Sequence, residues 1–246
     1  MTEDKLYIDD RLGDEPFRFD DAVARVFPDM LERSIPGYPA TLEAIGSLAA
    51  RFVRDGTNCY DLGCSLGAAT LAMRQGNRAA GVSIIAVDNS EAMISRCRQI
   101  VAEDDAAGSP DTAVELVLGD VLETPIDNAS MVVLNYTLQF LDPAGRDALV
   151  QRIFDGLVDG GVLVLSEKVV DEDAHMESLL VDLHHEHKRR NDYSALEIAR
   201  KRAALENVLV PETVAAHTAR LRKAGFSNSA VWLRYFNFVS IIAIRQ

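Results

Sequence analysis

Hydrophobic residues recur along this chain in two alternating patterns. Apolar positions three and four residues apart predict a helix after Pro39, carried by Leu42, Ile45 and Leu48. Short apolar runs predict strands, and amphipathic stretches between them predict further helices. We expect strands at residues 58–62, 82–87, 114–118, 131–135 and 162–165, and helices at 68–78, 90–103 and 143–157.

This alternation of strands and helices is typical of a parallel sheet with helices on both faces. After Pro211 a helix is expected to residue 223, and the aromatic and β-branched residues of 230–244 predict two closing strands. We expect Gly160 and Gly161 to close the helix before the fifth strand. The predicted fold class is therefore α/β and Rossmann-like, a seven-stranded, mostly parallel sheet with one antiparallel strand at its edge.

Two segments depart from the alternation. Residues 1–37 are predicted to form an irregular N-terminal arm whose aromatic residues Phe17, Phe19 and Phe27 pack onto the domain. Residues 171–207 predict a charge-rich helical insertion after the fifth strand, over the carboxyl edge of the sheet, where open α/β folds bind ligands. We interpret residues 1–246 as a single domain.

Charge and cysteine content narrow the class of protein. Acidic residues outnumber basic ones by 38 to 25, a net charge of −13 that disfavours direct binding to nucleic acid. No apolar run is long enough to cross a bilayer, and the acidic start of the chain is unlike a signal peptide. Three scattered cysteines (Cys59, Cys64 and Cys97) indicate a reducing compartment, so we expect a cytoplasmic protein that acts on a small molecule.

The most informative motif is the glycine loop YDLGCSLG at residues 60–67, between a strand and a helix. Gly63 and Gly67 allow the backbone to approach a ligand closely. Asp88, at the end of the next strand, stands where related folds present a carboxylate to a ribose diol. Ser65 takes the place of the second glycine of a pyrophosphate-binding loop, so the sequence favours a nucleoside-containing cofactor of another kind.

The following strand ends extend the same prediction. Asp120 and Val121 follow the third strand and suit the amino group and the face of an adenine, while Asn135 ends the fourth. A glycine loop, then an acid, then Asp after successive strands resembles the class I S-adenosylmethionine-dependent methyltransferase superfamily. The resemblance implies a Rossmann-like methyltransferase fold with S-adenosylmethionine bound at the carboxyl edge.

Longer stretches resemble a narrower family, the carboxy-S-adenosyl-L-methionine synthases. They are residues 26–30, 33–38, 60–70, 128–135, 137–141, 165–168 and 202–208. The resemblance implies conversion of S-adenosylmethionine and prephenate to carboxy-S-adenosylmethionine and phenylpyruvate, and we expect no metal. It also implies a homodimer, whose product serves a partner tRNA carboxymethyltransferase that forms 5-oxyacetyl uridine at the wobble position. The cofactor-binding residues it implies are Tyr38, Gly63, Cys64, Ser65, Asp88, Asn89, Asp120, Val121, Asn135 and Arg202.

Arg202 is also the expected catalytic residue. A guanidinium beside the sulfonium methyl disfavours methyl transfer, because like charges repel, but it suits a dicarboxylate substrate, which it can grip by two hydrogen bonds. Whether it serves its own site or a neighbouring subunit's is left open. We identify no dedicated protein base, because the hydroxide leaving prephenate can take the methyl proton.

Other interpretations remain. A conventional small-molecule methyltransferase is the main alternative function, and a non-enzymatic scaffold is less favoured because the cofactor motifs are intact. Cys64 lacks a partner base and is interpreted as a packing residue rather than a nucleophile. His184, His185 and His187 are not four apart, so they are not expected to bind a metal from one helix face.

Overall fold

The computed structural model describes residues 4, 6, 17–108, 112–205 and 208–246. Helices and strands alternate along most of the chain, as the hydrophobic pattern predicts. The elements are α1 (Asp21–Ser34), α2 (Tyr38–Phe52), β1 (Asn58–Leu62), α3 (Ala68–Gly76), β2 (Ser83–Asp88), α4 (Glu91–Ala106), β3 (Ala113–Leu118), β4 (Ala129–Asn135), the short 3-10 helix η2 (Leu138–Phe140), α5 (Pro143–Gly156), β5 (Leu157–Lys168), α6 (Ala174–Arg190), α7 (Ala195–Leu205), α8 (Val214–Ala224), β6 (Asn228–Tyr235) and β7 (Phe238–Ile244).

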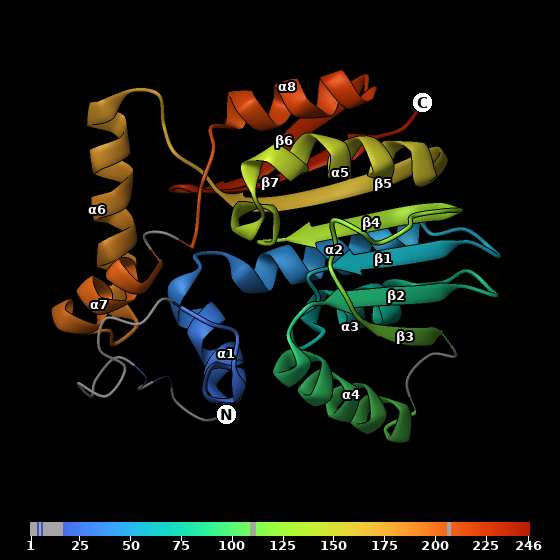
Figure 1. Ribbon diagram of the computed structural model, residues 1–246, viewed down its shortest axis with the longest axis horizontal. Helices are drawn as coiled ribbons and strands as arrows, with labels where there is room; N and C mark the ends of the chain where they lie inside the picture. Colours follow the sequence, from blue (N-terminus) through green and yellow to red (C-terminus); the bar gives the residue numbers. More distant parts are fainter. Residues whose placement is uncertain (1–3, 5, 7–16, 109–111, 206–207) are drawn as a thin grey trace.

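The strands form one seven-stranded sheet in the order β3-β2-β1-β4-β5-β7-β6 (Figure 1). Strands β1 to β5 are parallel, and β7 is antiparallel to both β5 and β6. The prediction of a mostly parallel sheet with one antiparallel strand is confirmed, but its position at the edge is wrong. The antiparallel strand β7 lies one place inside the sheet, because the closing hairpin adds β7 to β5 first and leaves β6 outside.

Helices cover both faces of the sheet and bury two separate apolar clusters. On one face, α5 and α8 contribute residues such as Ile153 and Leu221 to a cluster with Leu134 of β4 and Leu163 of β5. On the other face, α2 and α3 pack residues including Ile45 against alternate residues of the same strands. The side chains of β4 are therefore buried on both faces, which explains its nearly continuous apolar sequence.

The prediction of an irregular N-terminal arm is wrong for residues 21–34, which are helical. Residues 21–34 form α1, which Asp20 caps by accepting a hydrogen bond from Val23 N at 3.0 Å. Pro28 lies inside this helix and obscures its amphipathic pattern. The packing of the N-terminal aromatics is as expected, because Phe19 makes edge-on contacts with Phe27 and Phe140.

A second correction concerns the end of α5. This helix ends at Gly156, and Gly160 and Gly161 lie within the long strand β5 rather than at the helix terminus. Gly160 has a φ of +72°, and its amide donates to Arg245 O at 2.7 Å. The glycine pair therefore shapes an irregular start of β5 beside the chain's last strand.

The predicted insertion consists of α6 and α7. Together with α1 they gather beyond the carboxyl ends of the parallel strands (Figure 1). Ser34, at the end of α1, joins these elements: its carbonyl accepts from His184 Nε2 at 2.9 Å, and its hydroxyl accepts from Lys201 Nζ at 2.9 Å. The insertion thus closes over the edge of the sheet at which a ligand is expected.

No helix within residues 17–108, 112–205 and 208–246 combines the length and the apolar composition that crossing a bilayer requires.

The burial of β4 predicts the effect of one truncation. Leu134→Ala removes a side chain with 0% exposure from the centre of the sheet, and we expect it to lower the free energy of unfolding by about 2–5 kcal/mol. Leu118→Ala makes the same chemical change at the end of β3, where the side chain is 55% exposed, and should change it by less than about 0.5 kcal/mol. Urea denaturation of both variants tests this, and equal losses would contradict the proposed core.

Candidate functional site

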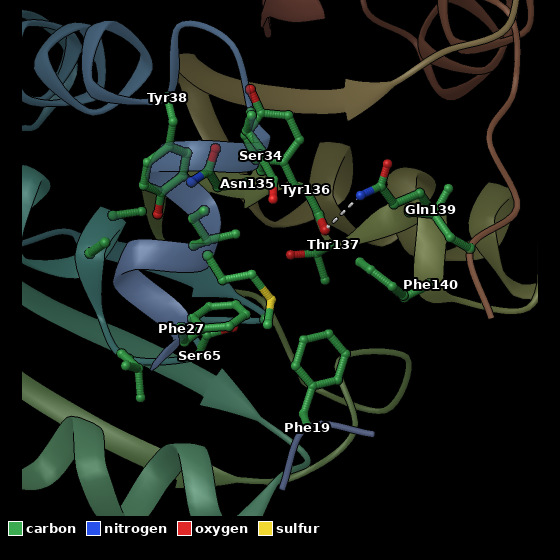
Figure 2. Close-up of a pocket in the computed structure, with 18 of the residues that line it drawn as sticks. Phe19, Phe27, Ser34, Tyr38, Ser65, Asn135, Tyr136, Thr137, Gln139 and Phe140 are labelled. Carbon is green, nitrogen blue, oxygen red and sulfur yellow. Dashed lines mark hydrogen bonds between the residues drawn. The ribbon is translucent and has the colours of Figure 1, made fainter. Parts of the chain in front are cut away.

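A cavity of about 620 Å³ opens at the carboxyl ends of the parallel strands. Its wall includes residues at or just after the carboxyl ends of β1 to β5, residues of α1 and α2, and residues of α6 and α7. Figure 2 shows side chains of α1, α2 and η2, and of the residues at the ends of β1 and β4, converging on the cavity. Every cofactor-binding residue expected from the sequence except Arg202 lines it: Tyr38, Gly63, Cys64, Ser65, Asp88, Asn89, Asp120, Val121 and Asn135.

The glycine loop is fixed in place by β2. The amides of Gly63 and Cys64 both donate to Val87 O, at 2.8 and 2.9 Å. Gly63 has a φ of +82°, and a Cβ on it would overlap the side chain of Thr137, which follows β4. Conformation and space therefore both require glycine here, and the loop backbone is exposed to the cavity.

Asp88 links this loop to the next helix. Its Oδ2 accepts from Ser65 N and its Oδ1 from Ser90 N, each at 2.9 Å, while Ser90 Oγ caps α4 by accepting from Met93 N. Burial raises the pKa of Asp88 above its ordinary value, and the two backbone donors oppose that effect. The carboxylate is thus rigidly oriented at the cavity wall, where a diol could donate to its remaining lone pairs.

Asp61 is a site residue that the sequence analysis missed. It lies in β1, 1% exposed, and lines the cavity. Its Oδ2 accepts from Thr70 Oγ1 at 2.6 Å, but its buried Oδ1 has no hydrogen-bond partner among the described residues. Burial raises its pKa to about 6. The signal in the sequence is an acid inside an otherwise apolar strand, two residues before Gly63.

The end of β4 adds a second unpartnered group and a strained residue. The buried Oδ1 of Asn135 has no hydrogen-bond partner in the described part of the chain. Tyr136 adopts a φ of +63°, unusual for a bulky residue, and its carbonyl accepts from Gln139 Nε2 at 3.3 Å (Figure 2). Its ring lies 6.2 Å from that of Tyr38, and burial raises the pKa of both phenols, so both keep their protons. Strain and unpaired polar atoms at one strand end indicate a ligand site.

The part of the cavity near the ends of β2 and β3 has buried apolar residues and exposed polar residues. Val121 is buried, and Phe19 and Phe140 pack edge to face with ring centroids 5.3 Å apart. Asn89 and Asp120 are exposed at this end. A flat aromatic group with polar edges, such as an adenine, matches this combination.

Arg202 lies apart from the other expected residues. It is on α7 and exposed, and the cavity wall includes its neighbour Lys201 instead. Its charge still reaches the site, because it contributes to lowering the pKa of Lys168 and of His185. Its role as a carboxylate clamp stays a prediction.

The other candidates of the sequence analysis have ordinary surroundings. Contact with Cys97 and burial raise the pKa of the Cys64 thiol, which opposes formation of a nucleophilic thiolate. His184 packs edge-on against Phe238 and donates to Ser34 O, and burial lowers its pKa to about 2, so its ring is neutral. Within the described residues, no three His, Cys, Asp or Glu side chains gather as a metal site.

A glycine loop after β1, an acid after β2 and an Asp after β3, arranged around one cavity, define an S-adenosylmethionine-binding protein of the methyltransferase fold. A family model described as "Methyltransferase domain" matches residues 60–161. The carboxy-S-adenosyl-L-methionine synthases of Salmonella paratyphi C (strain RKS4594) and Salmonella enteritidis PT4 (strain P125109) are each 55% identical over 235 residues, which cover 96% of this chain and 93% of theirs. The chain belongs to the carboxy-S-adenosyl-L-methionine synthase family.

Solved structures with little sequence identity share the fold. Human N-acetylserotonin methyltransferase, in complex with S-adenosylmethionine, matches with a TM-score of 0.62 at 16% identity, over 92% of this chain and 58% of that one. An O-methyltransferase family protein of Burkholderia thailandensis matches with a TM-score of 0.66 at 14% identity, over 95% of this chain and 65% of that one. The chain thus spans roughly three fifths of these larger proteins.

The packing of the glycine loop predicts the outcome of a matched pair of variants. Gly63→Ala and Gly56→Ala both force a left-handed residue to carry a side chain, at a cost of about 1–2 kcal/mol. A Cβ at Gly56 meets nothing within 4 Å, whereas at Gly63 it overlaps Thr137. We expect Gly63→Ala to be less stable than Gly56→Ala by about a further 1–3 kcal/mol. Chemical denaturation measures the difference, and equal stabilities would show that Thr137 does not constrain the loop.

Proposed function

We propose that the protein converts S-adenosylmethionine and prephenate to carboxy-S-adenosylmethionine, phenylpyruvate and water. The observation that carries this proposal is a cavity whose S-adenosylmethionine cradle continues into a wall containing Lys168, Lys188 and Lys201. A methyltransferase gains nothing from cations near a sulfonium, because like charges repel. An enzyme whose second substrate is a dicarboxylate needs them.

The cradle offers a group for each part of S-adenosylmethionine. Asp88 is proposed to accept from the ribose hydroxyls, and Val121 with Asp120 and Asn89 to hold the adenine. The loop at Gly63–Ser65 is proposed to follow the methionine chain. The unpartnered Oδ1 of Asp61 suits its α-ammonium group, because a buried carboxylate oxygen lacking a donor is stabilised by a cation.

The proposed reaction needs no further co-reactant. Bound S-adenosylmethionine supplies a methyl group that the sulfonium makes acidic. Prephenate loses its ring carboxylate as CO₂ and its hydroxyl as hydroxide when the ring becomes aromatic. The hydroxide takes one methyl proton to give water, and the methyl carbon forms a bond to the CO₂. The protein's part is to hold the two substrates in contact and to exclude bulk water.

The role of Arg202, the homodimer and the tRNA-modifying partner complete the proposal. Arg202 is proposed to clamp a carboxylate, which from its exposed position requires a movement of α7 or a second subunit to bring it over the methyl group. The carboxylated product is proposed to serve a tRNA carboxymethyltransferase. These assignments rest on the family to which the chain belongs.

Mass spectrometry tests the proposed reaction directly. The purified protein is incubated with S-adenosylmethionine, with and without prephenate, and the nucleoside products and phenylpyruvate are measured. We expect a product heavier than S-adenosylmethionine by one CO₂, only when prephenate is present and in equal amount to phenylpyruvate. Formation of S-adenosylhomocysteine without consumption of prephenate would contradict the proposal and support a conventional methyltransferase.

Asp61→Asn tests the cradle itself. The amide keeps the size of the side chain but removes its charge, so we expect the affinity for S-adenosylmethionine to fall about 10- to 100-fold in calorimetry. Asp159→Asn, at a side chain that is 91% exposed, is the matched control and should bind as the wild type does.

The same carboxyl sets a pH dependence. Because its pKa is about 6 in the folded protein, against 3.8 for an ordinary Asp, the unliganded site takes up a proton as the pH falls through 6. A protonated carboxyl cannot pair with an ammonium group. The affinity should therefore be constant above about pH 7 and fall about tenfold per pH unit below about pH 6. A flat profile in the wild type, or an unchanged profile in Asp61→Asn, would contradict the assignment.

A further inference from the structure

Three lysines from different elements meet on one wall of the cavity, which we call the lysine wall. Lys168 ends β5, Lys188 is on α6 and Lys201 is on α7. They influence one another electrostatically: the charges of Lys201 and Lys168 both act to lower the pKa of Lys188. The neighbouring His184 is neutral, so the positive charge on the wall itself comes from the lysines, and Arg202 acts on Lys168 from outside the cavity.

Few carboxylates lie close enough to neutralise the positive charge of the lysine wall. In the described part of the chain, Asp4 is the only carboxylate in ion-pair contact with it, with its Oδ2 3.6 Å from Lys201 Nζ. Tyr193 also donates to this oxygen, at 2.5 Å. Glu177 acts on Lys168 only at longer range, and its Oε2 already accepts from Asp171 N at 2.7 Å.

Lys168 and Lys188 both lack a direct partner for the ammonium group among the described residues, and Lys188 is the more buried of the two. It is 8% exposed, yet its ammonium group has neither a hydrogen bond nor an ion pair among the described residues. Burial, with the charges of its neighbours, lowers its pKa to about 7. A cation held out of water without a partner costs free energy, which a bound anion would recover.

The lysine wall lies across the cavity from the proposed nucleoside end. Asp120 follows β3 and Asp88 ends β2, whereas Lys168 ends β5, two places beyond β1 in the sheet order. Aromatic surface joins the two sides, because the ring of Phe238 lies 6.0 Å from that of Tyr136 and 4.8 Å from that of His184. Aromatic surface beside cationic side chains suits an anion that contains a ring.

We propose that Lys168, Lys188 and Lys201 form the subsite for the carboxylate of the pyruvyl side chain of prephenate, the one that phenylpyruvate retains. The proposal rests on the proposed function for the identity of the substrate. The proposed reaction indicates which of the two carboxylates of prephenate the lysines bind. The ring carboxylate loses its charge when it leaves as CO₂, so cations bound to it would stabilise the substrate more than the transition state. The pyruvyl carboxylate keeps its charge throughout, so the lysines can bind it without raising the barrier.

Lys188→Met tests the subsite. The substitution keeps most of the length of the side chain and removes its charge. In calorimetry with phenylpyruvate, and in KM for prephenate, we expect about 10- to 100-fold weaker binding, with S-adenosylmethionine affinity within about threefold of the wild type. The unfolding midpoint of the unliganded variant should equal or exceed that of the wild type, because an unpaired buried charge is removed.

Lys223→Met is the control for a change of one charge. Its side chain is on α8, 73% exposed and paired with Asp147, so the variant should bind both ligands as the wild type does. Lys168→Met provides a second test at the lysine wall and should weaken phenylpyruvate binding in the same direction. A loss of stability in Lys188→Met with unchanged phenylpyruvate binding would make the lysine structural and overturn the subsite.

Two further outcomes separate the subsite from the proposed function. If Lys188→Met loses S-adenosylmethionine affinity instead, the lysines bind the methionine carboxylate and the subsite is wrong. If the wild type binds phenylpyruvate through Lys188 but forms no carboxylated product, the subsite is supported and the proposed reaction is not.

Discussion

The parallel alignment of β1 to β5 is the constraint on which the site depends. Parallel strands carry their last residues to the same edge of the sheet, and the connecting helices run back along the faces, so they leave that edge uncovered. Residues far apart in the sequence, such as Asp61, Asn135 and Lys168, therefore line one cavity. The apolar packing of β4 on both faces keeps this arrangement rigid, and the contacts between Gly63, Thr137 and Val87 fix the loop nearest the ligand.

Sequence patterns predict the structural features that depend on residues close together in the chain. The hydrophobic periodicity predicts nearly every strand and helix, and the spacing of the glycine loop and Asp88 predicts a nucleoside site, because each depends on residues close together in the chain. The predictions that are wrong concern elements whose structure depends on residues that are distant in the sequence but close in space. Pro28 obscures α1, whose apolar face is defined by what it packs against, and the antiparallel strand depends on which of two similar strands pairs with β5.

The same distinction between neighbours in sequence and neighbours in space applies to the residues of the site. Sequence patterns do not predict Asp61 or the lysine wall. The significance of Asp61 lies in a buried oxygen without a partner, and that of the three lysines in their shared cavity, and both depend on the folded structure. Arg202 shows the converse: family resemblance selects it, yet on α7 it is exposed while its neighbour Lys201 faces the cavity. The net charge of −13 does not predict the three lysines that line the cavity, because a total charge carries no information about where charges lie.

The placement of α6 and α7 between β5 and α8 has a consequence for how such a protein can change. The sheet and its loops hold the groups proposed to bind the nucleoside, whereas two of the three cations on the opposite wall come from an excursion of the chain outside the sheet. Substitutions in that excursion can alter which acid is accepted without disturbing β4 or the glycine loop. The sheet and the inserted helices therefore carry separate parts of the proposed site, and each part can vary without changing the other.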